Sequence, residues 1–119
     1  MIVEVRNYRI RPGRRAEFIQ FFQTEAVPAQ RAHGIPVLGP MLDVENPNRF
    51  LWLRSFPSLE ERDRMKTAFY GGDVFLKELE PVATPMLDAY DFALCETTPG
   101  YVSDGFHQWL VPGTTRPDS

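Results

Sequence analysis

The chain has 119 residues, of which 43% are hydrophobic and 24% charged, and its formal net charge at pH 7 is −3. This length and apolar share suit a single domain with one hydrophobic core. The acidic balance argues against a general nucleic-acid binder, which needs a basic excess to neutralise phosphates. The apolar runs are too short to span a bilayer, and charges near the amino terminus argue against a signal peptide.

The single cysteine, Cys95, has no partner for an intramolecular disulfide, which favours a reducing compartment and predicts a cytoplasmic protein. Because Cys95 lies in an apolar stretch without a basic neighbour, we expect an inert core residue. The basic residues comprise eleven arginines and two lysines, Lys66 and Lys77. Codon usage in a GC-rich genome explains this imbalance on a solvated surface, and the alternative is that a few arginines hold an anion as planar forks.

The first half of the chain predicts a strand, a helix and two further strands. Residues 2–10 are rich in β-forming residues, and the turn Pro12-Gly13 ends them. A helix follows from Arg14 to His33-Gly34, and we expect Pro28 to kink it. Its apolar residues recur at helical spacing: Phe18, Phe21, Phe22, Ala26, Ala29 and Ala32. Residues 35–43 and 49–56 are strands, and the first is expected at a sheet edge because it contains prolines at positions 36 and 40.

The second half predicts helices and a last strand. Ser58 and Glu61 form a capping-box pattern that begins a helix ending at Gly71-Gly72. Its expected buried residues are Leu59, Met65 and Phe69. Asp73 is expected to cap a short helix with Val74, Leu76 and Leu79 on its apolar face. Residues 88–96 form the last strand, with Tyr90, Phe92 and Leu94 on one side.

The order of these elements is β-α-β-β-α-β, which predicts an α+β, ferredoxin-like fold with a four-stranded antiparallel sheet and helices on one face. The domain is expected to span residues 1–96. Residues 97–119 are then a carboxyl-terminal extension, whose segment Tyr101–Val111 is apolar enough to pack on the body or on a dimer partner. Since the second sheet face stays uncovered, it must be polar or paired with another surface.

Alternation along the strands sorts the side chains into two sets. One set is aliphatic and comprises Val3, Val5, Leu51 and Leu53. The other mixes charged and aromatic residues and comprises Glu4, Arg6, Tyr8, Phe50, Trp52, Arg54 and Phe56. We expect the aliphatic set to meet the helices. The mixed set would then lie on the uncovered face, where it suits the interior of a dimer with a polar pocket.

Four ordered segments of the chain resemble the NIPSNAP family, and the resemblance covers about residues 2–96. They are Glu4–Gly13, Glu25–Pro28 with Ala32–Gly34, Arg49–Pro57, and Ala68–Gly72. The resemblance implies a dimeric α/β barrel, in which two ferredoxin-like sheets stack through their uncovered faces. That superfamily includes cofactor-free monooxygenases, haem proteins and lactone isomerases, whereas no general reaction is established for NIPSNAP proteins. The chain departs from the family pattern at Pro81 and Pro85 and in the tail from Thr97 onward.

Arg6, Tyr8, Trp52 and Arg54 are the principal candidate site residues, because they share a side of two strands that are neighbours in this fold. In the functional interpretation, an arginine fork holds a carboxylate or enolate and Trp52 stacks on a flat ring. Tyr8 would then donate or accept a proton. In the structural interpretation, Glu4 pairs with Arg54 or Arg6, and the group only fixes the dimer.

Two further residues complete the candidate site. His33 is either a base at the mouth of the pocket or a helix-end residue that interacts with the helix dipole. Tyr70 is either a pocket-rim residue facing a ligand or part of a helix cap that fills the core. No histidine in the second helix is available as a proximal haem ligand, and the sequence has no metal-ligand spacing or phosphate-binding loop. We therefore expect no cofactor and no metal.

Two functions remain open at this point. The first is a homodimer that binds a small acidic or aromatic metabolite, as a cofactor-free monooxygenase or isomerase without nucleic-acid or membrane partners. The second is a non-catalytic binding or interaction module in which the same polar residues are structural. A pocket of roughly a few hundred cubic ångströms would favour the first, and an interior filled by Trp52 and its neighbours would favour the second.

Overall fold

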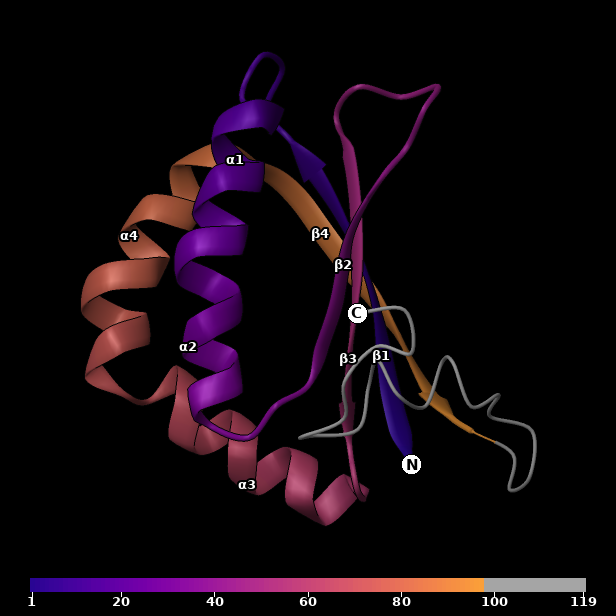
Figure 1. Ribbon diagram of the computed structural model, residues 1–119, viewed down its shortest axis with the longest axis vertical. Coiled ribbons are helices and arrows are strands. Elements are labelled where there is room, and N and C mark those ends of the chain that lie inside the picture. Colours follow the sequence, from indigo (N-terminus) through magenta and orange to yellow (C-terminus); the bar gives the residue numbers. More distant parts are fainter. Residues whose placement is uncertain (98–119) are drawn as a thin grey trace, which may run out of the picture.

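The computed structural model describes residues 1–97, which form a four-stranded antiparallel sheet with helices on one face (Figure 1). The strands lie in the order β2-β3-β1-β4, so β1 and β3 are central and β2 and β4 are the edges. This arrangement confirms the ferredoxin-like fold and the edge position of the proline-containing strand. The strand bounds are β1, Ile2–Ile10; β2, Val37–Leu42; β3, Arg49–Phe56; and β4, Leu87–Glu96.

The first crossover is one continuous helical run with a π-helical middle. It consists of α1 (Arg15–Phe21), the π-helical segment η1 (Phe22–Ala26) and α2 (Val27–Ala32). The disturbance expected at Pro28 therefore takes the form of a π-helical segment that comes before the proline. Gly34 follows α2 with φ of +77°, the left-handed conformation that glycine adopts without strain.

The second crossover is longer and more irregular. Its segments are α3 (Leu59–Tyr70), the π-helical η2 (Val74–Leu79), α4 (Glu80–Ala83) and the 3₁₀ turn η3 (Thr84–Met86). Pro81 and Pro85 lie at the starts of the last two segments, where a missing N–H is tolerated.

The sequence predictions for this crossover are confirmed only in part. The hydroxyl of Ser58 accepts a hydrogen bond from the backbone N–H of Glu61 at 3.1 Å, as the capping pattern predicts. The carboxylate of Asp73 makes no such capping bond. Of the expected apolar residues, Phe69 and Leu79 are buried, whereas Leu59, Val74 and Leu76 are exposed.

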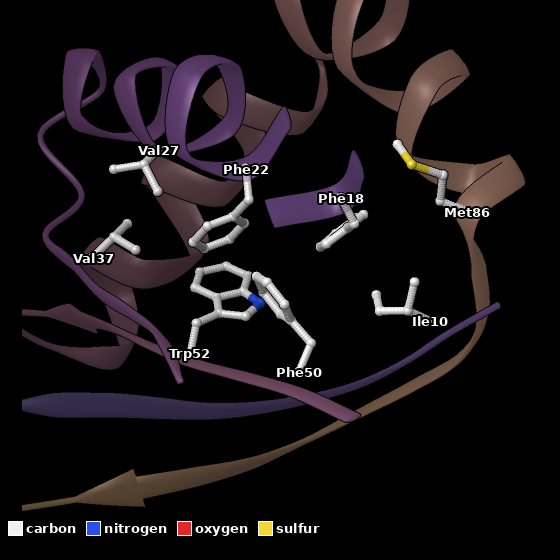
Figure 2. Close-up of a cluster of buried hydrophobic side chains, with 8 residues drawn as sticks. All are labelled: Ile10, Phe18, Phe22, Val27, Val37, Phe50, Trp52 and Met86. Carbon is white, nitrogen blue, oxygen red and sulfur yellow. The ribbon is translucent and has the colours of Figure 1, made fainter. Parts of the chain in front are cut away.

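Aromatic side chains from α1 and η1 pack directly on β3 (Figure 2). The rings of Phe18 and Phe50 lie 4.9 Å apart, and those of Phe22 and Trp52 lie 5.2 Å apart. This core is completed by Ile10, Val27, Val37 and Met86. A second cluster of buried residues comprises Ile2, Ile35, Phe56, Phe69 and Leu79.

The predicted assignment of the two sheet faces is wrong. Phe50 and Trp52 face the helices, and the register places Arg6 opposite Trp52 and Glu4 opposite Arg54 on that same side. The error has a physical cause. The phenylalanines of the first crossover offer an aromatic surface that matches the mixed set, and Glu4 neutralises part of its arginine charge.

The open face of the sheet carries an aliphatic patch beside the polar residues Asn7, Arg9, Arg49 and Asp91. Val5 and Leu53 pair across β1 and β3 on this side, and Leu38 and Met41 extend it along β2. Cys95 is exposed on the edge strand β4, which corrects the prediction of a buried core thiol. The expected packing of Tyr101–Val111 and the rest of the extension beyond Thr97 lies outside the described residues.

Candidate functional site

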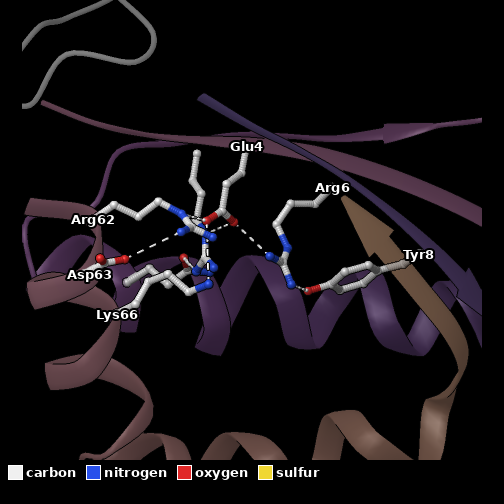
Figure 3. A network of polar contacts seen from close by, with 8 residues as sticks. Glu4, Arg6, Tyr8, Arg62, Asp63 and Lys66 are labelled. Atoms are coloured by element: carbon white, nitrogen blue, oxygen red, sulfur yellow. Dashed lines mark hydrogen bonds and ion pairs between the residues drawn. The ribbon is translucent and has the colours of Figure 1, made fainter. Parts of the chain in front are cut away.

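A single carboxylate lies at the centre of a cluster of basic side chains between the sheet and α3. Glu4 on β1 is fully buried. Its Oε1 accepts hydrogen bonds from Nη1 of Arg6 and from Nε of Arg54, both at 2.8 Å. Its Oε2 accepts a hydrogen bond from Nε of Arg62 at 2.6 Å, and Nζ of Lys66 lies 3.8 Å from it (Figure 3). One carboxylate thus joins β1, β3 and α3.

The neighbouring charges govern the ionisation of Glu4. Burial alone would raise the pKa of this carboxyl. The charge of Arg54 and hydrogen bonds from Arg62, Arg54 and Arg6 outweigh burial and lower the pKa from 4.5 to about 2. A second carboxylate, the exposed Asp63, lies 3.7 Å from Nη1 of Arg62. Four cationic side chains therefore meet two carboxylates, and the cluster keeps an excess of positive charge.

Three buried donor atoms at this cluster have no hydrogen-bond partner within residues 1–97: Nε of Arg6, Nη2 of Arg54 and Nε1 of Trp52. A buried donor without a partner costs about 1–3 kcal/mol, and more when it is charged. The guanidinium carbons of the two arginines lie 5.3 and 5.4 Å from the indole ring of Trp52, so both groups contact the same side chain. Positive charge with donors still available is the chemistry that binds an anion.

A cavity of about 450 Å³ lies beside the cluster, between the sheet and the helices. Its volume falls within the range of about 300–1,000 Å³ that is typical of small-molecule sites. Part of its wall comes from the π-helical segments η1 and η2, and π-helical turns are frequent at functional sites. Its polar lining includes Arg6, Gln30 and Lys66, and its apolar lining includes Phe18, Phe21, Phe22, Phe69, Phe75 and Leu79.

Tyr8 lies in the same cavity as a protonated hydroxyl. Burial raises the pKa of Tyr8 above its usual value, and the charge of Arg6 offsets only part of that increase. Nη2 of Arg6 donates a hydrogen bond to the Tyr8 oxygen at 3.3 Å. Since that oxygen acts as the acceptor, its own proton is available to a ligand. The side chains of Tyr90 and Phe92 on β4 also line the cavity, and they are 63% and 39% exposed, so this wall is open to solvent.

The structure brings most of the predicted site residues together, but on the helix side of the sheet. Arg54 is fully buried and contacts the cavity only through its neighbours, with Nη1 donating to Oε1 of Gln30 at 3.0 Å. The predicted residues that line the cavity are Arg6, Tyr8, Trp52 and Tyr70. The pocket therefore lies within a single chain, between its sheet and its helices.

His33 lies apart from this group. Its side chain is exposed at the end of α2, where Nδ1 lies 3.2 Å from the carbonyl oxygen of Ala29. Its ring packs edge-on against Phe69 at 5.4 Å and does not line the cavity.

Within residues 1–97, no group of three or more His, Cys, Asp or Glu side chains is arranged to hold a metal ion. None of the helices described there is both long and apolar enough to cross a membrane.

The sequence profile of the NIPSNAP family matches residues 3–89, which is most of the chain. The chain belongs to the NIPSNAP family. Among curated proteins, none matches this NIPSNAP sequence.

Several solved structures share the fold of this NIPSNAP protein. A NIPSNAP-like domain protein from Burkholderia xenovorans has a TM-score of 0.78 and 23% identity, covering 99% of this chain and 97% of that one. A NIPSNAP domain protein from the same organism has a TM-score of 0.76 and 18% identity, covering 84% and 97%. A protein named antibiotic biosynthesis monooxygenase has a TM-score of 0.63 and 17% identity, covering 83% and 100%. At these identities the likeness shows a common fold.

Sequence reasoning missed Arg62, Lys66 and Gln30 as parts of the site in this NIPSNAP protein. Arg62 and Lys66 are four residues apart on α3, so they lie on one helix face and reach Glu4 together. That spacing is visible in the sequence, and so is the rarity of lysine. Gln30 on α2 carries no comparable signal.

Proposed function

We propose that this NIPSNAP protein binds a small organic acid with a flat apolar body in the cavity beside Glu4. The observation that carries the proposal is the excess of positive charge, with unpartnered buried donors, at the wall of an aromatic cavity. In this proposal, Arg6 holds the carboxylate as a planar fork. Trp52 and the phenylalanine rings of the lining pack against the apolar body.

The competing interpretation is that the charged cluster is purely structural. Glu4 joins three elements, and buried ion pairs often fix a fold without binding a ligand. The two interpretations differ in the importance of the ligand's charge. A structural cluster has no reason to prefer an acid over a neutral molecule of the same shape.

Calorimetric titration with 4-phenylbutanoate and with its neutral amide tests this proposal. We expect saturable binding of the acid and at least about tenfold weaker binding of the amide, which corresponds to about 1.4 kcal/mol. Arg6→Gln should weaken acid binding to a similar extent. The matched variant Arg14→Gln, at an exposed ion pair with Glu17 outside the cavity, should bind like the unaltered protein. Equal binding of acid and amide, or no binding by folded protein, would favour the structural interpretation.

A second candidate function, proton transfer on the bound acid, is supported by the geometry of Tyr8. The Tyr8 hydroxyl would donate a hydrogen bond to the carbonyl oxygen of a bound oxo acid while solvent water takes the proton from the adjacent carbon. The guanidinium of Arg6 would stabilise the enolate that forms. Such a step is common to cofactor-free oxygenation and to isomerisation. Tyr8→Phe should then retain acid binding in calorimetry but slow hydrogen–deuterium exchange at the enolisable carbon of a bound oxo acid, measured by NMR. Unchanged exchange in Tyr8→Phe would exclude this role.

The same proposal includes a homodimer formed through the open face of the sheet. Val5, Leu38, Met41 and Leu53 form an aliphatic patch on this face, and the described helices all lie on the other side (Figure 1). A partly exposed apolar patch of this kind favours pairing. A second copy of the chain offers the same aliphatic surface in a two-fold arrangement. The single cysteine fits a reducing compartment, so a cytoplasmic location belongs to the proposal as well.

A further inference from the structure

Lys66 lies in the cavity in an environment that is unusual for a lysine. Its side chain projects from α3, is 24% exposed and lines the cavity. Its Nζ is 3.8 Å from Oε2 of Glu4, and it lies 5.7 and 5.5 Å from the rings of Tyr70 and Phe92. The amine therefore borders both the charged cluster and the aromatic part of the lining.

The surroundings of Lys66 lower the pKa of its amine. Burial lowers the pKa of this amine, Glu4 raises it, and the charges of Arg62, Arg54 and Arg6 lower it again, with a net decrease from 10.5. Glu4 is the main opposing influence, and its carboxylate also accepts hydrogen bonds from the same three guanidiniums.

Within residues 1–97, the ion pair of Lys66 is with Glu4, and a further carboxylate, Glu80 of α4, lines the same cavity. On α3, the carboxylate of Asp63 is 78% exposed and pairs with Arg62. From β1, Tyr8 contributes a protonated hydroxyl that accepts from Arg6. A lysine beside other cations in a partly apolar pocket is the arrangement that activates an amine as a nucleophile.

The chain supplies its own reference, because Lys77 is the only other lysine. The side chain of Lys77 is 75% exposed on η2, and its Nζ lies 3.7 Å from Oδ2 of Asp73. It faces solvent and a single carboxylate partner, so it has none of the features that set Lys66 apart.

We propose that Lys66 is a nucleophilic amine that forms an imine with the carbonyl group of a 2-oxo acid bound in the cavity. The substrate class rests on the proposed binding of an organic acid by Arg6. The neutral amine adds to the carbonyl carbon, and a proton moves from nitrogen to oxygen to give a carbinolamine. Loss of water then leaves the protonated imine. No oxidant, reductant or metal enters this balance.

The geometry favours a carbonyl directly beside the carboxylate. Nη1 of Arg6 and Nζ of Lys66 both approach the single carboxylate of Glu4, one at each oxygen. Both cationic side chains therefore border the same carboxylate, and both line the cavity. In a 2-oxo acid, the carboxylate would meet the guanidinium while the neighbouring carbonyl meets the amine.

Reductive trapping on the intact chain tests the proposal. The probe is 2-oxo-4-phenylbutanoate with cyanoborohydride, and peptide mass spectrometry separates Lys66, Lys77 and the amino terminus. An adduct should add the mass of the probe acid less one oxygen atom. We expect at least about tenfold more adduct on Lys66 than on Lys77. Lys66→Arg should remove the adduct while keeping a positive charge, and the matched variant Lys77→Arg should retain it.

The failure of this inference can be separated from the failure of acid binding. 4-Phenylbutanoate has the same body and carboxylate but no carbonyl, so its calorimetric binding reports the acid site alone. Binding of that acid without an adduct on Lys66 would contradict imine formation but would still support acid binding in the cavity. Equal trapping of the neutral ketone 4-phenyl-2-butanone would overturn the 2-oxo acid assignment. Equal labelling of the two lysines would overturn any special reactivity of Lys66.

Discussion

The two faces of the sheet are built from the same strands but have opposite chemistry. On the helix side, Glu4 and Arg54 are fully buried and joined by a hydrogen bond. On the open side, Val5 and Leu53 occupy the neighbouring positions of the same two strands and carry no polar atoms in their side chains. The buried charges lie on the face covered by helices, whereas Arg9 and Arg49 on the open side are exposed. A charged side chain can therefore be buried in this sheet where oppositely charged partners surround it, and hydrophobicity alone does not determine which residues are buried.

The largest expected effect comes from removing the carboxylate on the helix side. Glu4→Gln leaves the guanidiniums of Arg6, Arg54 and Arg62 without their shared anion in a buried site. We expect a loss of about 3–5 kcal/mol in the free energy of unfolding, measured by urea denaturation. Glu17→Gln, which removes an exposed carboxylate paired with Arg14, should leave stability unchanged. Similar losses in the two variants would mean that the buried cluster contributes no more to stability than an exposed ion pair.

The pH dependence of the free energy of unfolding tests how the buried carboxylate of Glu4 contributes to stability. The pKa of Glu4 is lowered from 4.5 to about 2 in the folded chain, so its ionised form stabilises the fold above pH 4.5. That contribution is lost as the pH falls from 4.5 towards 2. The stability difference between the unaltered protein and Glu4→Gln should therefore shrink over this window. A difference that stays constant from pH 7 to 3 would contradict the ionisation assigned to Glu4.

A charge placed on the open side tests whether that face is paired. Leu53→Asp should leave the protomer folded but raise the dimer dissociation constant at least about a hundredfold, or about 2.7 kcal/mol. Analytical ultracentrifugation measures this change. Val44→Asp, at a loop residue that is 98% exposed, should have no effect. A monomeric parent protein, or a dimer that tolerates Leu53→Asp, would remove the open face from the proposed interface.

The pairing of the edge strand β2 with β3 is irregular between Leu38 and Met41. Leu38 pairs with Leu53 and Met41 with Leu51, so one extra residue keeps both on the open side. Gly39 lies in this irregularity with φ of +131°, and an added Cβ would lie 2.9 Å from Cβ of Trp52.

Gly39→Ala should cost about 2 kcal/mol of unfolding free energy, from backbone strain and overpacking together. Gly13→Ala is the matched control, because Gly13 has φ of +82° but no atom within 4 Å of an added Cβ. It should cost only about 1 kcal/mol. Equal losses in denaturation experiments would show that the contact with Trp52 is easily relieved.

The smallest expected effect concerns the helix that completes the charged side. The hydroxyl of Ser58 caps α3, which carries Arg62 and Lys66. Ser58→Ala should cost about 1 kcal/mol of unfolding free energy, seen in thermal or urea denaturation. Because the rest of α3 stays packed, binding of 4-phenylbutanoate should persist. Loss of binding would indicate that the cap also controls the position of Arg62 and Lys66.

Local signals in the sequence were sufficient to predict the architecture. The proline-containing strand lies at an edge, and Ser58 caps its helix, because both features depend on backbone hydrogen bonds of a few adjacent residues. The pairing of Glu4 with Arg6 and Arg54 was also foreseen, as one of two alternatives.

The assignment of faces failed because it depends on non-local contacts. Alternation sorts side chains into two sets but does not say which set meets the helices. Polarity suggested the aliphatic set, whereas the contacts of Phe18 with Phe50 and of Phe22 with Trp52 favour the mixed one. For the same reason, alternation along the strands did not indicate that Arg62 and Lys66 belong to the site. These residues reach Glu4 only after α3 docks on the sheet.

The central strand β1 contributes to both faces at once. Glu4, Arg6 and Tyr8 serve the cavity, while Val3 and Val5 alternate with them on the open side. Insertion or deletion of one residue between Glu4 and Tyr8 would put the residues on its two sides out of phase and move part of the charged set to the opposite surface. Evolution of this segment should therefore tolerate changes of residue type more readily than changes of length. The spacing within β1 constrains the charged cluster and the open face together.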